Sequence, residues 1–296
     1  MRASFRSRGT AVLAAATLAT SLAATTFGTA SASGSTAHRA AAAHTTARRL
    51  PPVVVNVRVT KDGLTRSRSN FRPGNTIVNI RSAGGGGTVE VMRLHHGYTV
   101  AELRKDFSTL FNGDVQAVRS IDKHVEFYGG SQVYKHRTAS FATYLHRGHY
   151  LIANLDKGTL TRMRVAGDRQ LRSLPHATGR VNLVREDRFG NPGVRRHTGW
   201  MRTTNRTDEP HFVDLGRVKA STTRHMVKKY FDEGAQGQPD WALKAMAGTL
   251  VVGPGHTVLW RYHLPRGKYL EMCWWPSDED GMPHALMGMW ALTHLR

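Results

Sequence analysis

Two short motifs occur twice in this 296-residue chain, in the same order and at nearly the same separation. Residues 96–99 (His-Gly-Tyr-Thr), which precede a helical pattern, have a counterpart at residues 220–223, 124 positions later. Residues 145–151 (Leu-His-Arg-Gly-His-Tyr-Leu) match residues 264–270 (Leu-Pro-Arg-Gly-Lys-Tyr-Leu), 119 positions later. Motifs repeated in a constant order and spacing indicate a duplicated structural unit. The chain is therefore expected to contain two copies of one domain.

The two copies are expected at residues 53–165 and 183–296, with a connector at residues 166–182 between them. The segment Val53–Val59 is β-branched and alternates in polarity, which indicates a strand. Further short strands are expected at residues 76–80, 89–92, 125–128, 140–145, 150–153 and 268–273. Short strands joined by turns favour an all-β fold with two Greek-key antiparallel β-sandwich domains.

Each copy also contains the pattern of one short helix. In the first copy, Thr99 and Glu102 form a capping box, and the apolar residues that follow fall on one helical face. In the second copy, Thr223 begins a similar pattern, which ends at Gly234. The predicted domains are therefore sandwiches that carry one short helix each.

The N-terminus is expected to be a secretory signal peptide at residues 1–32. Three arginines precede an apolar run at residues 11–27, and small residues at 30–32 supply a cleavage point. Residues 33–52 are rich in Ala, Thr, Ser and Arg without periodicity, which is typical of a disordered linker. A cut after Ala37, which would expose His38 as an N-terminal metal ligand, fits less well because the better cleavage site lies upstream. No later apolar run is long enough to cross a bilayer, so a secreted, extracellular protein is expected.

The chain is strongly basic, with 42 Lys and Arg against 21 Asp and Glu, a formal net charge of +21. Such an excess favours association with an anionic extracellular polymer or an acidic redox partner. No motif for sequence-specific nucleic-acid recognition is present. No pattern in the sequence indicates an oligomeric state.

The single cysteine, Cys273, ends the strand expected at 268–273, and it can form no internal disulfide. It is either a metal ligand or a small buried apolar residue. His284 and Met289 follow it, and a thiolate, an imidazole and a thioether together suit a soft transition metal such as copper. The repeat offsets place Gly87 opposite His211 and Asn154 opposite Cys273. Only the second copy therefore carries residues of the ligand types.

Residues 183–296 resemble the cupredoxin superfamily of type 1 copper proteins. The resemblance is carried by residues 205–211 (Asn-Arg-Thr-Asp-Glu-Pro-His), by 264–269 before the cysteine, and by Pro-His at 283–284 with Gly-Met at 288–289. It implies that His211, Cys273 and His284, with Met289 as the axial ligand, hold one copper ion. The first copy resembles the same fold only in outline.

One departure from the family pattern is the spacing of the ligands. Ten residues, 274–283, separate Cys273 from His284, where blue copper proteins usually have only a few. Such a loop can still return to a metal, because closure entropy rises slowly with length. The tight hydrogen-bonded loop that shapes a blue site is expected to be missing. A scaffold that has lost its metal therefore stays open as an alternative.

Two functions follow from these patterns. The first is an extracellular copper protein for electron transfer or copper handling. The second is a metal-free binding or structural protein whose basic surface adheres to an anionic polymer or partner. An enzyme is less expected, because the chain lacks the His-x-His pairs of multicopper oxidases and the Gly-x-Ser-x-Gly turn of hydrolases. The pairs His95–His96 and His146–His149, and Met287 in place of Met289, are further potential ligands.

Overall fold

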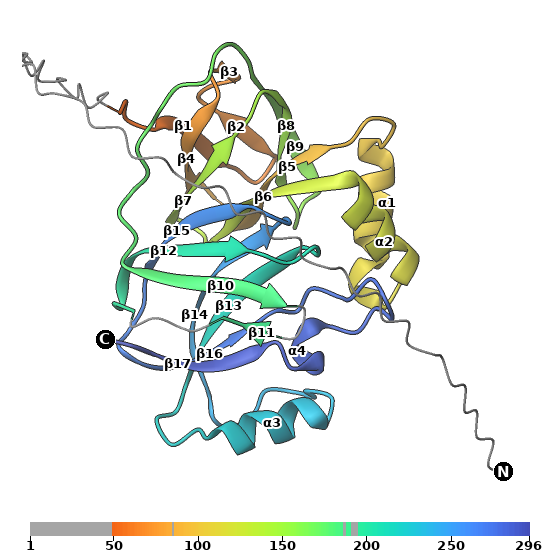
Figure 1. The fold of residues 1–296 in the computed structure, drawn as a ribbon, viewed down its shortest axis with the longest axis vertical. Coiled ribbons are helices and arrows are strands. Elements are labelled where there is room, and N and C mark those ends of the chain that lie inside the picture. The colour runs from red at the N-terminus through yellow and green to blue at the C-terminus, as the bar shows by residue number, and fades with distance from the viewer. Residues whose placement is uncertain (1–48, 85, 186–187, 191–194) are drawn as a thin grey trace, which may run out of the picture. The chain divides into compact units, whose positions relative to one another are not determined.

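A computed structural model describes residues 49–84, 86–185, 188–190 and 195–296 of the chain (Figure 1). The expected signal peptide at 1–32 and residues 33–48 of the expected linker lie outside this part. In the described part, no helix is both long and apolar enough to span a membrane. Regular pairing begins at Leu50, which exchanges backbone hydrogen bonds with Leu171 and Ser173 of the connector. Within the described residues, backbone pairing therefore includes a position three residues before the first expected strand.

The described residues fold into two β-sheets and a few short helices (Figure 1). The first sheet has eight strands, in the order β11 (Arg188–Phe189), β10 (Gly179–Arg185), β12 (Thr198–Asn205), β15 (Thr257–His263), β7 (Thr138–Leu145), β4 (Gly74–Ser82), β1 (Val53–Val59) and β2 (Leu64–Arg66). The second has nine, in the order β17 (Trp290–Leu295), β16 (Gly267–Met272), β13 (His211–Val218), β14 (Ala242–Val252), β6 (Val125–Val133), β5 (Gly87–Leu94), β8 (Gly148–Asn154), β9 (Thr159–Val165) and β3 (Asn70–Phe71). The fold is all-β, as the sequence predicts.

The strands alternate buried and exposed residues as the sequence pattern requires. In β1, Val53, Val55, Val57 and Val59 are buried and the residues between them are more exposed. Inward side chains from both sheets and both halves of the chain, Trp260 and Trp275 among them, form one core cluster. Burial of this apolar layer between two sheets is the main stabilising term of such a sandwich.

The sheets are mixed, whereas the sequence favoured antiparallel pairing. Strand β1 pairs in parallel with β4, and β10 pairs in parallel with β12. The reason is the path of the chain, which leaves β1 through β2 on its outer edge and returns on its inner edge as β4. Two reversals bring β4 back in the direction of β1.

Strand pairing joins the two halves of the chain in both sheets. In the first sheet, Val258–Trp260 of β15 pair with Phe141–Thr143 of β7. In the second, Val252 of β14 pairs with Tyr128 of β6. Read outward from these junctions, the strand order is the same in each half: β7-β4-β1-β2 against β15-β12-β10-β11, and β6-β5-β8-β9 against β14-β13-β16-β17.

The repeated sequence motifs adopt matching local structures. Thr99 and Thr223 are both helix N-caps whose hydroxyls accept a backbone N–H three residues on, and Thr99 completes the predicted capping box. The Tyr150 hydroxyl donates to the carbonyl four residues before it, at 2.9 Å. The Tyr269 hydroxyl does the same at 2.6 Å.

The helices are α1 (Val100–Thr109), the 3-10 helix η1 (Leu110–Asn112), α2 (Val115–His124), α3 (Arg224–Asp232) and α4 (His284–Met287). The sequence patterns predict α1 and α3 but not α2. Strand-favouring residues such as Val118 and Ile121 line the buried face of α2, so its composition conceals its helical period. Its start signal is local: the Asp114 carboxylate accepts hydrogen bonds from the N–H groups of Gln116 and Ala117.

Candidate metal centre

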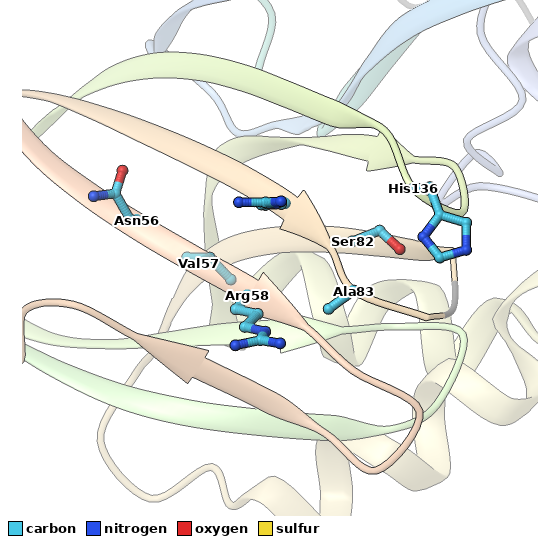
Figure 2. Close-up of a pocket in the computed structure, with 7 residues that line it drawn as sticks. Asn56, Val57, Arg58, Ser82, Ala83 and His136 are labelled. Carbon is cyan, nitrogen blue, oxygen red and sulfur yellow. The ribbon is translucent and has the colours of Figure 1, made fainter.

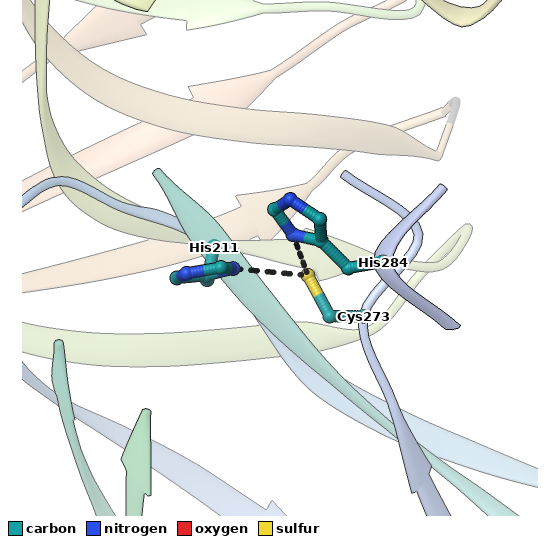
Figure 3. Close-up of side chains that lie close together, drawn as sticks. All are labelled: His211, Cys273 and His284. Atoms are coloured by element: carbon teal, nitrogen blue, oxygen red, sulfur yellow. Dashed lines mark hydrogen bonds between the residues drawn. The ribbon is translucent and has the colours of Figure 1, made fainter. Parts of the chain in front are cut away.

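Three of the predicted ligands lie together at one end of the second half. His211 is the first residue of β13, Cys273 follows the last residue of β16, and His284 is the first residue of α4. Because β13 and β16 are antiparallel neighbours, the start of one lies beside the end of the other. The Cys273 Sγ is 3.7 Å from the His211 Nδ1 and 3.8 Å from the His284 Nδ1 (Figure 3).

The spacing of these three atoms fits a single metal ion. All three lie within 4.8 Å of one another. Metal–nitrogen and metal–sulfur bonds of about 2.0 and 2.3 Å, meeting near the tetrahedral angle, put the two ligand atoms about 3.6 Å apart. The separations in the protein match this value. Among the described residues this is the one group of three His, Cys, Asp or Glu side chains placed to hold a metal ion.

The ligand residues are fully buried, and burial shifts the pKa of Cys273 and of His211. It raises the pKa of the Cys273 thiol from 9.0 to about 12, although the amides of Phe212 and Trp275 partly oppose this. Burial, and then the neighbouring His284, lowers the pKa of His211 well below its usual 6.5. His211 is therefore neutral at pH 7 and keeps a nitrogen lone pair. The thiol keeps its proton until a cation displaces it.

One ring nitrogen of His211 has no hydrogen-bond partner in the described part of the protein. Its Nε2 is buried and has no hydrogen-bond partner among the described residues, while its Nδ1 faces the sulfur. The rings of His211 and His284 lie with centroids 4.6 Å apart and tilted by 50°. Two imidazoles that converge on one thiol form a set of soft and borderline donors.

A carboxylate outside this group holds one of the imidazoles. The Glu209 Oε2 lies 2.9 Å from the His284 Nε2, which leaves the Nδ1 of that ring directed at the sulfur. The segment that carries Glu209 is itself fixed: the Asn205 amide donates to the carbonyls of Glu209 and Val252 at 2.7 and 2.8 Å. A carboxylate in this position sets the orientation of a metal-binding histidine. The motif at 205–211 thus supplies a ligand and the orienting group for a second ligand.

The ten residues between Cys273 and His284 form a compact hairpin. Its strands are closed by bonds from the Ser277 N–H to the Met282 carbonyl, 2.9 Å, and from the His284 N–H to the Trp275 carbonyl, 2.9 Å. The Ala285 N–H then donates to the Cys273 carbonyl at 2.7 Å. The long loop is therefore hydrogen-bonded along its length and returns His284 to the cysteine. From the length of the loop, the tight hydrogen-bonded loop that shapes a blue site was expected to be missing.

Met289 is buried and bonded to the same loop. Its N–H donates to the His284 carbonyl at 2.8 Å, and its carbonyl accepts the Cys273 N–H at 3.3 Å. Gly288 precedes it with φ of 115°, a conformation that favours glycine. Backbone hydrogen bonds thus join Met289 to both Cys273 and His284. The role of Met289 as axial ligand stays a prediction.

The first half of the chain covers this loop, which sequence analysis did not foresee. The Arg119 guanidinium of α2 donates to the carbonyls of Asp278 and Glu279 at 2.7 and 3.2 Å. The Trp275 ring packs edge-on against Phe111 and Phe127, with centroids 6.1 and 5.5 Å away. Contacts this far apart in the sequence leave no local signal.

The equivalent place in the first half has no ligand residues. Gly87 and Asn154, predicted to occupy the positions of His211 and Cys273, do lie together there. A Cβ added to Gly87 would stand 2.8 Å from the Asn154 Nδ2. The Asn154 side chain fills the space that a histidine would need. The pairs His95–His96 and His146–His149 belong to no cluster of three ligands in the described structure.

A cavity of about 820 Å³ opens beside the metal centre. Its lining includes Phe212, next to one ligand, and Trp275, two residues after another. Phe107 and Phe111 of the first half face the same space. The ligand residues themselves are fully buried and do not line this cavity.

No protein-family model and no curated protein matches the chain. Among solved structures it is similar to auracyanin A, a "blue" copper protein from Chloroflexus aurantiacus, at 11% identity over 39% of this chain and 99% of that one, with TM-score 0.29. It is also similar to auracyanin from Roseiflexus castenholzii, at 19% identity over 40% of this chain and 94% of that one, with TM-score 0.23. A copper-containing nitrite reductase from Thermus scotoductus matches at 11% over 83% and 62%, with TM-score 0.21. Because these identities and TM-scores are low, the case for a metal at this centre depends on the geometry of its own residues.

Proposed function

We propose that this chain is a secreted, cupredoxin-like protein that binds one copper ion through His211, Cys273 and His284, with Met289 as a fourth, axial ligand. The convergence of the first three ligand atoms within 4.8 Å, in a fully buried site, is the observation that carries the proposal. A closed site with no position for substrate suits electron transfer or copper handling rather than catalysis at the metal.

The donor set favours copper over zinc. Structural zinc sites use four strong ligands, usually cysteines and histidines. Here the proposed set is one thiolate, two imidazoles and the thioether of Met289, which is a weak ligand suited to soft metals and to blue-copper centres. A bound copper ion would supply one-electron redox chemistry.

The surrounding residues suit a site that changes little between redox states. The Phe212 N–H points at the Cys273 Sγ from 3.5 Å, and a donor to the sulfur stabilises negative charge on it. Glu209 holds the ring of His284, and the hairpin at 274–283 fixes the separation of the two ligands that it joins. Trp275, which is wholly buried, helps to exclude water. These contacts hold the ligand side chains in fixed positions.

We further propose that the two halves arose by duplication and that only the second kept a metal centre. The matching strand order, the paired caps Thr99 and Thr223, and the paired hydroxyl bonds of Tyr150 and Tyr269 support this. The first half has acquired a different use, since it packs its α2 helix on the ligand loop.

A redox partner is part of the proposal. Because the ligand residues are fully buried, such a partner would have to dock on the surface around them. The cavity is lined by Phe212, which follows His211 in the sequence, and by Trp275, two residues after Cys273. Aromatic side chains there provide a contact surface for a partner. Residues 1–32 would direct the protein out of the cell.

The test is to titrate the purified mature protein with Cu(II) and to record the visible spectrum. We expect an intense thiolate-to-copper band at one equivalent of copper, and its loss in Cys273→Ser. Met289→Leu is expected to keep the band but to shift its position and the reduction potential, because it removes only a weak ligand.

The control variant is Met282→Leu, which alters an exposed methionine in the same loop. It should leave the band unchanged. A protein that shows no band, and whose copper uptake is the same in Cys273→Ser, would be the metal-free scaffold instead.

A further inference from the structure

The outward face of the eight-stranded sheet carries arginine and no acidic residue. All eight of its strands lie in the described part of the chain, and none contains Asp or Glu. Five exposed arginines, which we call the arginine face, lie on five of these strands: Arg58, Arg81, Arg180, Arg202 and Arg261. The chain as a whole has one acidic residue for every two basic ones. The absence of acidic residues from these eight strands therefore departs from the composition of the chain.

Strand register places the arginines on one side of the sheet. Arg58 is paired with Arg81 across β1 and β4, and Arg180 with Arg202 across β10 and β12. Arg261 is paired with Trp200, which is two residues from Arg202 and therefore points the same way.

A chain of neighbours connects the two arginine pairs. Arg202 lies opposite Leu259, Leu259 opposite Ala142, and Ala142 opposite Ile77. Ile77 and Arg81 are four residues apart on β4, hence on the same face. The path from β10 to β1 crosses five strand intervals, or about 24 Å. Leu259 and Ala142 are themselves fully buried, so the arginine face consists of two exposed groups, Arg58 with Arg81 and Arg180 with Arg202 and Arg261, which lie farther apart than one small anion can bridge.

The five guanidinium groups are unpaired. None forms an ion pair or a side-chain hydrogen bond with another residue in the described part of the structure. Like charges on adjacent strands repel each other, so the pairs Arg58–Arg81 and Arg180–Arg202 cost stability unless an anion lies between them. Guanidinium forks bind sulfate, phosphate and carboxylate oxygens through two parallel bonds.

Amides and a hydroxyl lie beside the pair Arg58 and Arg81. Asn79 donates to Asn56 at 3.2 Å and accepts from Ser140 at 2.9 Å, which forms a short polar ladder across three strands. A pocket of about 470 Å³ opens at this end, lined by Asn56, Arg58, Arg81 and His136 (Figure 2). Amide and hydroxyl side chains can form hydrogen bonds with the hydroxyl groups of a sugar. A polymer that offered only phosphate groups would need only the cationic side chains.

We propose that the arginine face binds an acidic polysaccharide, with its sulfate or carboxylate groups paired to the arginines and one charged sugar ring in the pocket at Arg58 and Arg81. This binding is independent of the copper proposal. It would fix the secreted protein to an extracellular matrix or wall. The two kinds of acidic group share the same recognition chemistry, and the experiment separates them.

The test measures binding to dextran sulfate and to polygalacturonate, with neutral dextran as the uncharged reference. The face variant replaces four arginines by glutamine: Arg58→Gln, Arg81→Gln, Arg180→Gln and Arg202→Gln. The control variant removes the same charge from four exposed arginines outside this sheet: Arg162→Gln, Arg164→Gln, Arg206→Gln and Arg266→Gln. We expect roughly 10- to 100-fold weaker binding for the face variant and less than threefold for the control.

The salt dependence gives a second measurement. The slope of log affinity against log salt should fall by about one for each arginine that contacts an anionic group, so it should fall in the face variant only. Equal loss in both variants would mean that net charge alone drives adhesion, and the proposal would be wrong. Tighter binding of single-stranded DNA through the same arginines would overturn the polysaccharide assignment. If circular dichroism shows the face variant to be unfolded, the two-residue variants R58Q/R81Q and R180Q/R202Q decide the question.

Discussion

The Arg119 guanidinium lies 2.7 Å from the backbone carbonyl of Asp278, although 159 positions separate the two residues in the sequence. Arg119 belongs to α2 in the first half, and Asp278 is at the tip of the hairpin that joins Cys273 to His284. Gly281 completes the contact, since a Cβ at this position would stand 3.2 Å from the Gly113 carbonyl. The half without ligand residues thus contacts the loop that joins two residues of the candidate metal centre.

Replacement of Arg119 by alanine should loosen this loop. Two charge-assisted bonds at an exposed site are lost, and we expect an effect of about 1 kcal/mol, or roughly fivefold in metal affinity. Amide hydrogen exchange at residues 277–282 of the metal-free protein should become faster by a similar factor. Arg104→Ala is the matched control, because Arg104 donates to the Gly158 carbonyl at 2.9 Å, away from the loop. Unchanged hydrogen exchange in the Arg119 variant would show that the contact is not needed to hold the loop in place.

Glu209→Gln should weaken metal binding without preventing it. The Glu209 carboxylate lies 2.9 Å from the His284 Nε2, and loss of its charge leaves the ring less basic and less firmly held. Changes of this kind cost about 10- to 100-fold in metal affinity. Competition with a chelator of known affinity measures the effect. Glu279→Gln, at an exposed position in the loop, is the control and should alter the affinity less than threefold.

The stability of the protein should depend on the ionisation of Asp122. Burial, with smaller contributions from Glu209 and Asp278, raises the pKa of this carboxyl from 3.8 to about 8. The folded state therefore binds a proton more tightly than the unfolded chain, and its stability falls as pH rises from about 4 to about 8. Asp122→Asn should remove most of this decline. Relative to the wild type, the free energy of unfolding of the variant should therefore be higher at pH 8 than at pH 4. Urea unfolding of both proteins at the two pH values provides the comparison.

The ion pair between Arg195 and Glu271 should be costly to break on one side. Both side chains are completely buried, in contact with each other and close to the end of the strand that leads to Cys273. Glu271→Gln leaves a buried guanidinium uncompensated, for which we expect a loss of about 3–5 kcal/mol in the free energy of unfolding. The double variant E271L/R195M should recover much of that loss. A single variant as stable as the wild type would show that water reaches the pair.

Local patterns in the sequence were sufficient for several of the elements. The alternation in Val53–Val59 and the capping box at Thr99 predict a strand and a helix that the structure contains. Each signal depends on neighbours within a few residues, where pleat and helical period dictate which side chains share a face. The helix α2 escaped prediction because its β-branched residues carry the opposite preference.

The sequence by itself also determined which residues could bind a metal, because ligand chemistry belongs to the side chains: one thiol at 273, an imidazole on either side of it in the chain, and a late thioether. Tertiary structure decided whether they meet. The distance from His211 to Cys273 depends on the pairing of β13 with β16, and the return of His284 depends on a hairpin held by α2. The same holds for the arginine face, whose residues become neighbours only through strand register. Such contacts join segments many residues apart, and their free energy depends on how the whole chain packs.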